Sequence, residues 1–318
     1  MRHLAILDDY LKRALSSAEW DSLPGSINIQ VFHNTVSDED LLASALAEFE
    51  VIIAMRERTP FPASLLKRLP NLKLLVTTGM RNLSIDLHAA RSCGIDVCGT
   101  SMLGYPAFEH AWALLLALAK NICPENQLMH AGGWQAGITG DLQNRTVGII
   151  GLGKLGSQSA HLANAFGMRV IAWSENLTEQ RAQECGAQCV DKQTLLTESD
   201  YILIHTLLSE RTVGLISTED FKLMKSSAFL INTSRGPIVD ESALITAIQE
   251  RQIAGAGVDV FDTEPLAEDH PIRREEKIIL TGHTGYSTEA AFDLMYSQAL
   301  EDVRAWLEGS PVRVLNAE

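Results

Sequence analysis

The sequence has little positive charge, no long hydrophobic run and few cysteines. It contains 26 lysine and arginine residues against 40 aspartate and glutamate residues, which gives a formal net charge of −14. A surface with this excess of negative charge should repel nucleic acid and anionic membranes, so we expect neither as a partner. A small anionic substrate would therefore need a local positively charged site.

The hydrophobic segments are too short for a membrane protein. The longest apolar run, around residues 111–119, falls short of the roughly 20 residues that a membrane-spanning helix needs. The first residues, Met1–Leu7, have the pattern of a β-strand rather than a signal peptide, and we expect a cytoplasmic protein.

The cysteines do not have the spacing of a zinc site. Their number is odd, and no histidine lies near the two that are closest in sequence. We therefore expect reduced thiols and no bound metal. The five are Cys93, Cys98, Cys123, Cys185 and Cys189.

The length of 318 residues fits two domains of common size. In the first hundred residues, strand-like and helix-like segments alternate, which predicts a parallel sheet covered on both faces. Asp8-Asp9 should cap a helix that runs to Trp20, and Ser37-Asp-Glu-Asp40 should open a helix that runs to about Glu48. Strands are expected at residues 2–7, 27–32, 51–54, 73–76 and 95–98.

A second series of strands begins at Thr146. We expect strands at residues 146–150, 169–173, 201–204, 228–231, 254–258 and 278–280. The predicted fold class is α/β, with two Rossmann-like or flavodoxin-like doubly wound domains, parallel sheets and a cleft between them.

Two helices should cross between the domains. Residues 107–120 are apolar almost all round, and residues 288–307 form a long amphipathic pattern, after which residues 311–315 could return to the first domain. We predict a discontinuous first domain, residues 1–101 and 287–318, and a second domain, residues 102–286.

A glycine turn stands directly between the strand at residues 146–150 and a helix-like segment. Gly151, Gly153 and Gly156 form the pattern G-x-G-x-x-G, which allows a tight turn, a close approach to pyrophosphate and close packing of helix on strand. A helix beginning near Lys154 would direct its free N–H groups at the phosphates. The alternative is a merely structural glycine turn, but the strand before it and the helix after it favour nucleotide binding. We therefore expect residues 102–286 to form a dinucleotide-binding domain, and residues 1–101 with 287–318 to form the substrate-binding domain.

Further candidate residues follow other predicted strands, at the carboxyl edge where open α/β sheets bind ligands. Arg235 stands on a turn, Glu264 follows Asp259 in a short loop, and His283 lies between glycines. A surface arginine or a cap loop would explain Arg235 alone, but a histidine flanked by glycines has little packing role.

Together these side chains would suit the reduction of a 2-oxo acid. That reaction needs a cation for the carboxylate, a proton donor for the new alkoxide and a hydride source. Arg235 could supply the cation and His283 the proton, and a hydrogen bond to Glu264 would fix the tautomer of the imidazole.

With these residues in view, the chain resembles the D-isomer-specific 2-hydroxyacid dehydrogenase family over nearly its whole length. The resemblance rests on residues 151–156, 232–241 and 257–265, and on His283 followed by Gly285. It implies an oxidoreductase that transfers hydride between NAD(P)H and a small 2-oxo acid, such as glyoxylate or hydroxypyruvate, to give a D-2-hydroxy acid. The helix around residues 109–120 is similar to the interdomain helix of the family, which implies a homodimer.

The resemblance also implies roles for individual residues. Arg235 would bind substrate, His283 would be the proton donor, and Glu264 would be its partner. The loop with Gly79, Met80 and Arg81 would receive the substrate carboxylate, although Arg81 replaces a usual glycine and could equally be a surface residue. The implied cofactor-binding residues are Gly151, Gly153, Lys154, Leu155, Gly156, Ser174, Glu175, Thr206, Thr233, Ser234, Asp259 and Gly285.

Three alternatives stay open at this point. Ser174 stands where NAD-preferring members carry an acidic residue, yet Glu175 would repel a 2′-phosphate, so the sequence does not decide between NAD and NADP. A phosphoglycerate dehydrogenase-type enzyme is possible, although no lysine or arginine cluster is ready for a phosphate. The same fold also serves co-repressor-like proteins that sense a dinucleotide.

Overall fold

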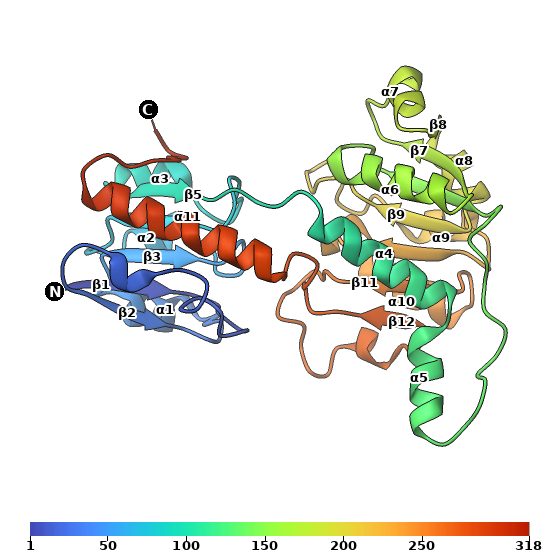
Figure 1. The fold of residues 1–318 in the computed structure, drawn as a ribbon, viewed down its shortest axis with the longest axis horizontal. Helices are drawn as coiled ribbons and strands as arrows, with labels where there is room; N and C mark the ends of the chain where they lie inside the picture. The colour runs from blue at the N-terminus through green and yellow to red at the C-terminus, as the bar shows by residue number, and fades with distance from the viewer. Residues whose placement is uncertain (318) are drawn as a thin grey trace. The chain divides into compact units, whose positions relative to one another are not determined.

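The protein folds into two compact units. The computed structural model describes residues 1–317. One unit comprises Met1–Leu103 with the chain from Ser287 onward, and the other comprises Gly104–Tyr286. Each contains one parallel sheet flanked by helices (Figure 1), which confirms the predicted fold class of two α/β domains.

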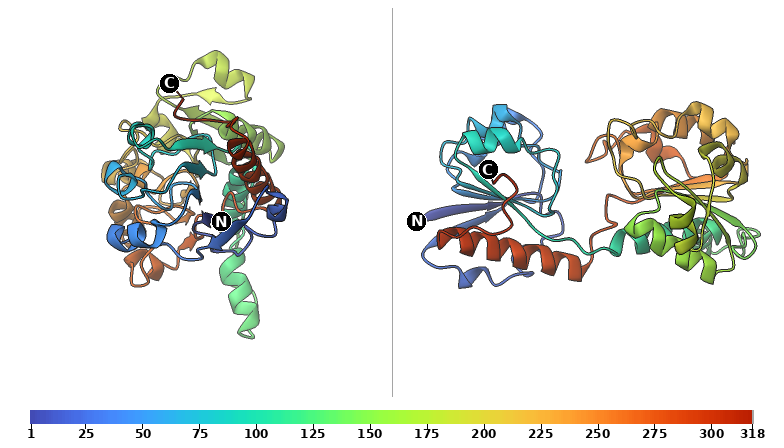
Figure 2. Two further views of the ribbon diagram at one scale, coloured as in Figure 1. Left: turned by 90° about the vertical axis from the view of Figure 1, so that its left-hand side faces the viewer. Right: turned by 90° about the horizontal axis from the view of Figure 1, so that it is seen from above.

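The first unit has a five-stranded sheet in the order β2-β1-β3-β4-β5. Helices α1, α2 and α3 cover one face and the long helix α11 covers the other (Figure 2). The central strands are buried along their length because both faces are covered. The elements are β1 (Arg2–Ile6), β2 (Ile27–Val31), α1 (Glu39–Leu46), β3 (Val51–Ala54), α2 (Ala63–Leu66), β4 (Leu74–Thr77), α3 (Leu87–Ser92), β5 (Asp96–Gly99) and α11 (Glu289–Leu307).

The helix predicted from Asp9 to Trp20 is wrong. This segment forms successive turns and ends in a short 3-10 helix, η1 (Trp20–Ser22). Asp8 adopts a positive φ of 57°, and its carboxylate accepts hydrogen bonds from the hydroxyls of Thr35 and Thr59. The predicted cap side chain is therefore engaged by residues far away in the sequence, which sequence periodicity does not reveal.

The helix predicted from Ser37 does form, but it begins later. The side chain of Asp38 accepts from the N–H of Leu41 and is the N-cap of α1. The cap therefore lies one residue beyond the predicted one.

The C-terminal segment returns to the sheet of the first unit, as expected. The N–H of Leu315 donates to the carbonyl of Val97 at 2.7 Å, and the N–H of Gly99 donates to the carbonyl of Arg313 at 3.1 Å. The Asn316 side chain accepts from the N–H of Val97 and donates to the carbonyl of Ile95. The tail thus covers an edge of the sheet next to β5.

A buried carboxylate, Asp302 on α11, anchors this tail. Its Oδ1 accepts from Nε of Arg313 at 3.0 Å, and its side chain is fully buried. Burial raises the pKa of Asp302 to about 7 from 3.8, even though Arg313 acts in the opposite direction. The folded state therefore binds this proton more tightly than the unfolded state.

We expect the stability of the protein to fall as the pH rises from about 4 to about 7 through this group. Asp302 contributes its full stabilisation at a pH below its pKa in the unfolded chain. That contribution is lost as the pH rises through its pKa in the folded protein. Denaturant unfolding of wild type and Asp302→Asn at pH 5 and pH 8 tests this. Between pH 5 and pH 8, the free energy of unfolding of the wild type should fall by about 1–4 kcal/mol more than that of the variant. Parallel pH profiles would refute the expectation, and the exposed Asp293→Asn on the same helix is the control.

The second unit has a seven-stranded sheet in the order β12-β11-β10-β9-β6-β7-β8. Every pairing in it is parallel. The strands are β6 (Thr146–Ile150), β7 (Arg169–Trp173), β8 (Gln188–Cys189), β9 (Tyr201–Ile204), β10 (Phe229–Asn232), β11 (Gly255–Val258) and β12 (Ile278–Leu280). Since all strands run the same way, all their carboxyl ends lie at one edge.

Helices cover both faces of this sheet (Figure 2), and a hydrophobic core lies on each face. One packs Trp112, Ala160 and Ala182 from α4, α6 and α7, and the other packs Leu195, Phe221 and Leu244 from α8, α9 and α10. The helices are α4 (Pro106–Ala119), α5 (Ile122–His130), α6 (Lys154–Ala165), α7 (Glu179–Glu184), α8 (Lys192–Glu198), α9 (Thr218–Leu223) and α10 (Glu241–Gln249), with 3-10 helices η2 (Gly236–Ile238) and η3 (Pro271–Arg274).

Helix α5 was not predicted. It has no buried residues and extends away from the sheet of its unit (Figure 1). Without a buried face, its sequence lacks the apolar periodicity that reveals a helix.

Along residues 1–317, no helix combines the length and the apolar character needed to cross a membrane.

Candidate active site

The glycine turn after β6 has the geometry of a phosphate-binding loop. Gly151 has a φ of 95°, and a Cβ there would lie 2.8 Å from the backbone of His205 and Thr206. A Cβ on Gly156 would lie 2.0 Å from the carbonyl oxygen of Gly151, so this glycine lets α6 pack on the turn. Only glycine fits at these two positions.

The mouth of this turn is open toward solvent. A Cβ on Gly153 would meet no atom within 4 Å, and Gly153 is the N-cap of α6 without a side-chain cap. Lys154 and Leu155 form the first turn of the helix, so their N–H groups belong to its uncapped end. An anion fits here, because backbone donors and the helix dipole both favour negative charge.

The other predicted cofactor residues follow strands at the same edge. Ser174 and Glu175 come directly after β7, Thr206 comes two residues after β9, and Thr233 comes directly after β10. Ser234 connects two of these loops, because its hydroxyl donates to the carbonyl of Ile204 at 2.9 Å. The predicted carboxyl edge is thus where the structure gathers these residues.

Arg235 lies on the loop between β10 and η2. The Asn232 side chain holds this loop by donating to the carbonyl of Arg235 at 3.0 Å and accepting from the N–H of Ser234 at 3.1 Å. The guanidinium is half-buried and donates to the carbonyl of Ser234 at 2.7 Å. The neighbouring Gly236 packs against the backbone of Phe261, which links this loop to the one that carries Glu264.

His283 and Glu264 form a hydrogen-bonded pair. Nδ1 of His283 lies 2.6 Å from Oε2 of Glu264, and the two side chains are 20% and 29% exposed. The other carboxylate oxygen, Oε1, accepts from the N–H of Phe261 at 2.9 Å. Both carboxylate oxygens of Glu264 are therefore held by hydrogen bonds. Nδ1 of His283 carries the proton of its bond, because a carboxylate can only accept.

Asp259 lies beneath this pair and is almost fully buried. Its oxygens accept from the N–H groups of Thr284 and Gly285, each at 2.8 Å, and from the hydroxyl of Thr281 at 2.5 Å. Burial alone would raise the pKa of Asp259, but hydrogen bonds from His110 and Thr281 hold the pKa below its usual range. The carboxylate is ionised and holds the His283 loop.

The predicted substrate loop lies in the first unit. Gly79 is buried with a φ of 137°, whereas Met80 and Arg81 are exposed. Sequence reasoning missed Arg56, whose Nη1 would lie 2.5 Å from a Cβ on Gly79 and whose side chain is 17% exposed. The Asn82 side chain ties the two segments by donating to the carbonyl of Arg56 at 2.6 Å. The guanidinium next to the loop is thus that of Arg56.

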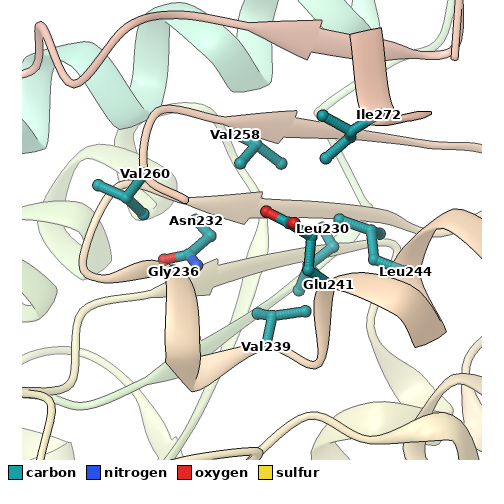
Figure 3. Close-up of a pocket in the computed structure, with 9 residues that line it drawn as sticks. All are labelled: Leu230, Asn232, Gly236, Val239, Glu241, Leu244, Val258, Val260 and Ile272. Atoms are coloured by element: carbon teal, nitrogen blue, oxygen red, sulfur yellow. The ribbon is translucent and has the colours of Figure 1, made fainter. Parts of the chain in front are cut away.

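A cavity of about 10 Å³ lies under the Arg235 loop (Figure 3). This volume is enough for about one water molecule, so neither a dinucleotide nor a 2-oxo acid fits. The side chains that line it are mainly apolar, with the carboxyl of Glu241 and the amide of Asn232 as polar groups. Burial raises the pKa of Glu241, whose Oε1 lies 3.0 Å from Nε2 of His270.

Curated proteins and solved structures resemble this chain along most of its length. The glyoxylate reductase of Aeropyrum pernix is 33% identical over 88% of this chain and 86% of its own length. The D-3-phosphoglycerate dehydrogenase of a Synechocystis species is 35% identical over 89% of this chain, which spans about half, 51%, of that relative. The structure of a phosphoglycerate oxidoreductase from Vibrio cholerae matches with a TM-score of 0.92 and 31% identity over 98% of this chain and 100% of that one.

The fold and the residues at the sheet edge define a dinucleotide-binding dehydrogenase. A family model described as "D-isomer specific 2-hydroxyacid dehydrogenase, NAD binding domain" matches residues 112–285. The chain therefore belongs to the D-isomer specific 2-hydroxyacid dehydrogenase family. This confirms the resemblance found in the sequence, and with it an oxidoreductase whose cofactor is a nicotinamide dinucleotide.

Proposed function

We propose that this chain reduces a small 2-oxo acid, such as glyoxylate or hydroxypyruvate, to the D-2-hydroxy acid. Relatives named glyoxylate reductase and hydroxypyruvate reductase support this substrate class. The observation that carries the proposal is the 2.6 Å hydrogen bond between His283 and Glu264, at the sheet edge that also carries Arg235.

Each residue of this set has a task in the proposed reaction. His283 holds one proton on Nδ1 toward Glu264, so Nε2 is the nitrogen that passes a proton to the carbonyl oxygen. Arg235 binds the carboxylate and the neighbouring carbonyl through paired N–H bonds. When bound, the nicotinamide dinucleotide supplies the hydride.

The cofactor would be held by the residues gathered at the same edge. The Gly151–Gly156 turn and the start of α6 suit its pyrophosphate, and Thr206, Thr233 and Ser234 line the neighbouring strand ends. Ser174 and Glu175, at the end of β7, would set the choice between NAD and NADP. In this proposal the second unit binds the cofactor and also carries Arg235, Glu264 and His283.

A panel of substrates tests the proposal. The oxidation of NADH and of NADPH should be followed with glyoxylate, hydroxypyruvate, pyruvate, bulkier 2-oxo acids and phosphorylated hydroxypyruvate. We expect saturable turnover of at least one small 2-oxo acid. Preference for the phosphorylated compound would favour a phosphoglycerate dehydrogenase, the class named for several relatives. Cofactor binding without turnover on the whole panel would contradict the proposal and favour the co-repressor-like sensor.

We also propose a homodimer, formed through α4 and the arm that follows it, residues 121–140. This arm exposes large apolar side chains, with Ile122 54%, Trp134 75% and Ile138 fully exposed. Several large, exposed apolar side chains on one segment support a protein contact there. Light scattering should give twice the chain mass, and a monomer at all concentrations would refute the dimer.

The cytoplasm is the proposed location, with no nucleic-acid or membrane partner. All five cysteines lie in the described part of the chain and are free thiols, which suits a reducing compartment. The net charge of −14 opposes binding to nucleic acid or to an anionic membrane.

A further inference from the structure

We propose that His110, on α4, is a positioning residue that holds the His283 loop in place through Thr281 and Asp259. The inference rests on the proposed function, because its task is to align the proton donor. Nε2 of His110 lies 2.9 Å from Oγ1 of Thr281 and 3.3 Å from Oδ1 of Asp259. These residues come from three separate elements: α4, the end of β11 and the end of β12.

The direction of each hydrogen bond follows from the chemistry of Asp259. Its carboxylate is ionised and can only accept, so the Thr281 hydroxyl, 2.5 Å away, must donate to it. The oxygen of Thr281 is then an acceptor for His110. Nε2 of His110 therefore carries a proton, and the chain of hydrogen bonds runs from His110 through Thr281 to Asp259.

The far end of this chain is the backbone around His283. The carboxylate of Asp259 accepts from the N–H groups of Thr284 and Gly285. The backbone carbonyl of Asp259 accepts from the N–H of His283 at 2.7 Å. The three N–H groups belong to consecutive residues, 283–285. The side chain and the backbone of one buried residue, Asp259, therefore hold the loop.

His283 needs this fastening because its backbone is strained. Its φ is 53°, in the left-handed region that residues with a Cβ rarely adopt. Such a conformation persists only where the surroundings fix it. The hydrogen bond between His283 and Glu264 depends on the same conformation, because it sets the direction of the ring. Any loosening at Thr281 therefore lowers the fraction of molecules with an aligned proton donor.

The test compares His110→Ala with His110→Gln in the full-length protein. Loss of the Nε2 donor should lower kcat about 10-fold, while KM for the 2-oxo acid and the affinity for NADH change less than about 3-fold. Glutamine offers an amide donor of similar reach and should restore kcat to within about 3-fold of wild type. His161→Ala, an exposed histidine on α6, is the matched control and should behave as wild type.

A double-mutant cycle shows whether His110 acts through Thr281. Thr281→Val alone should also lower kcat about 10-fold, and the double variant His110→Ala/Thr281→Val should lose little more than either single variant. Fully multiplicative losses would overturn the proposed chain, as would an unchanged kcat in His110→Ala. If His110→Ala does not fold, the test uses Thr281→Val and His110→Gln, and the kcat of each is compared with that of wild type.

Proton NMR provides a readout that does not require turnover. The short bond from Nδ1 of His283 to Glu264 should give a downfield proton resonance, assigned by its loss in His283→Gln. We expect that resonance to broaden or vanish in His110→Ala and to persist in His110→Gln and His161→Ala. Its persistence in His110→Ala would overturn the inference, whereas an inactive wild type that shows these changes would overturn only the proposed function.

Discussion

Replacing His283 by alanine should lower kcat by about 1000-fold, within the range by which general acid catalysts act. In the proposed reaction the imidazole is the proton donor, and its Nδ1 is hydrogen-bonded to Glu264 at 2.6 Å. Without it the alkoxide must take a proton from water, while the cofactor turn, far along the sheet edge after β6, keeps its structure. Steady-state kinetics and NADH titration measure the two effects separately.

Glu264→Gln is the informative companion of this variant. The amide keeps the shape of the side chain but removes the negative charge beside His283, so kcat should fall by less, about 10- to 100-fold. Circular dichroism should show the same fold for both variants. A His283→Ala protein with nearly wild-type kcat would exclude this histidine as the proton donor.

Replacing Arg235 by alanine should lower kcat/KM by about 1000-fold. A guanidinium that binds a carboxylate through paired N–H bonds contributes several kcal/mol, and its loss leaves the substrate without its main counter-charge. The loop itself should stay in place, because Asn232 holds it by bonds to the backbone of Ser234 and Arg235. Kinetics with the best 2-oxo acid of the panel provide the measurement.

Three comparisons sharpen this prediction. Arg235→Lys should recover only part of the loss, since a single ammonium cannot reproduce the planar fork. Added guanidinium chloride at low concentration should partly rescue Arg235→Ala and not Arg235→Lys. The exposed Arg274→Ala in the same unit should match wild type. Equal activity of Arg235→Ala and Arg274→Ala would remove Arg235 from the site.

The strands were the most predictable part of the fold. Val51–Ala54, Tyr201–Ile204 and Ile278–Leu280 were predicted with the observed bounds, because strands covered on both faces are continuous apolar runs. The segment from Asp9 to Trp20 was wrong and α5 was missed. In the first case Thr35 and Thr59, far away in the sequence, engage the predicted cap side chain, and in the second no buried face marks the helix.

The candidate site was predictable where short motifs carry the chemistry. The pairing of Glu264 with His283 was expected from their residue types and is present in the structure. The contact of His110 with Thr281 spans 171 residues of sequence, and the contact of Arg56 with Gly79 depends on how two strand ends meet. Neither follows from spacing along the chain, because only the folded sheet brings these side chains together.

The central claim is that hydride passes from a nicotinamide cofactor to the carbonyl carbon of a 2-oxo acid on this protein. The most direct test is a reaction with NADH or NADPH that carries deuterium at the transferable position, followed by mass spectrometry and chiral analysis of the product. The account predicts one deuterium at C2 of a D-2-hydroxy acid, formed in a one-to-one ratio with oxidised cofactor. An unlabelled C2, or cofactor binding with no product from any 2-oxo acid, would contradict it.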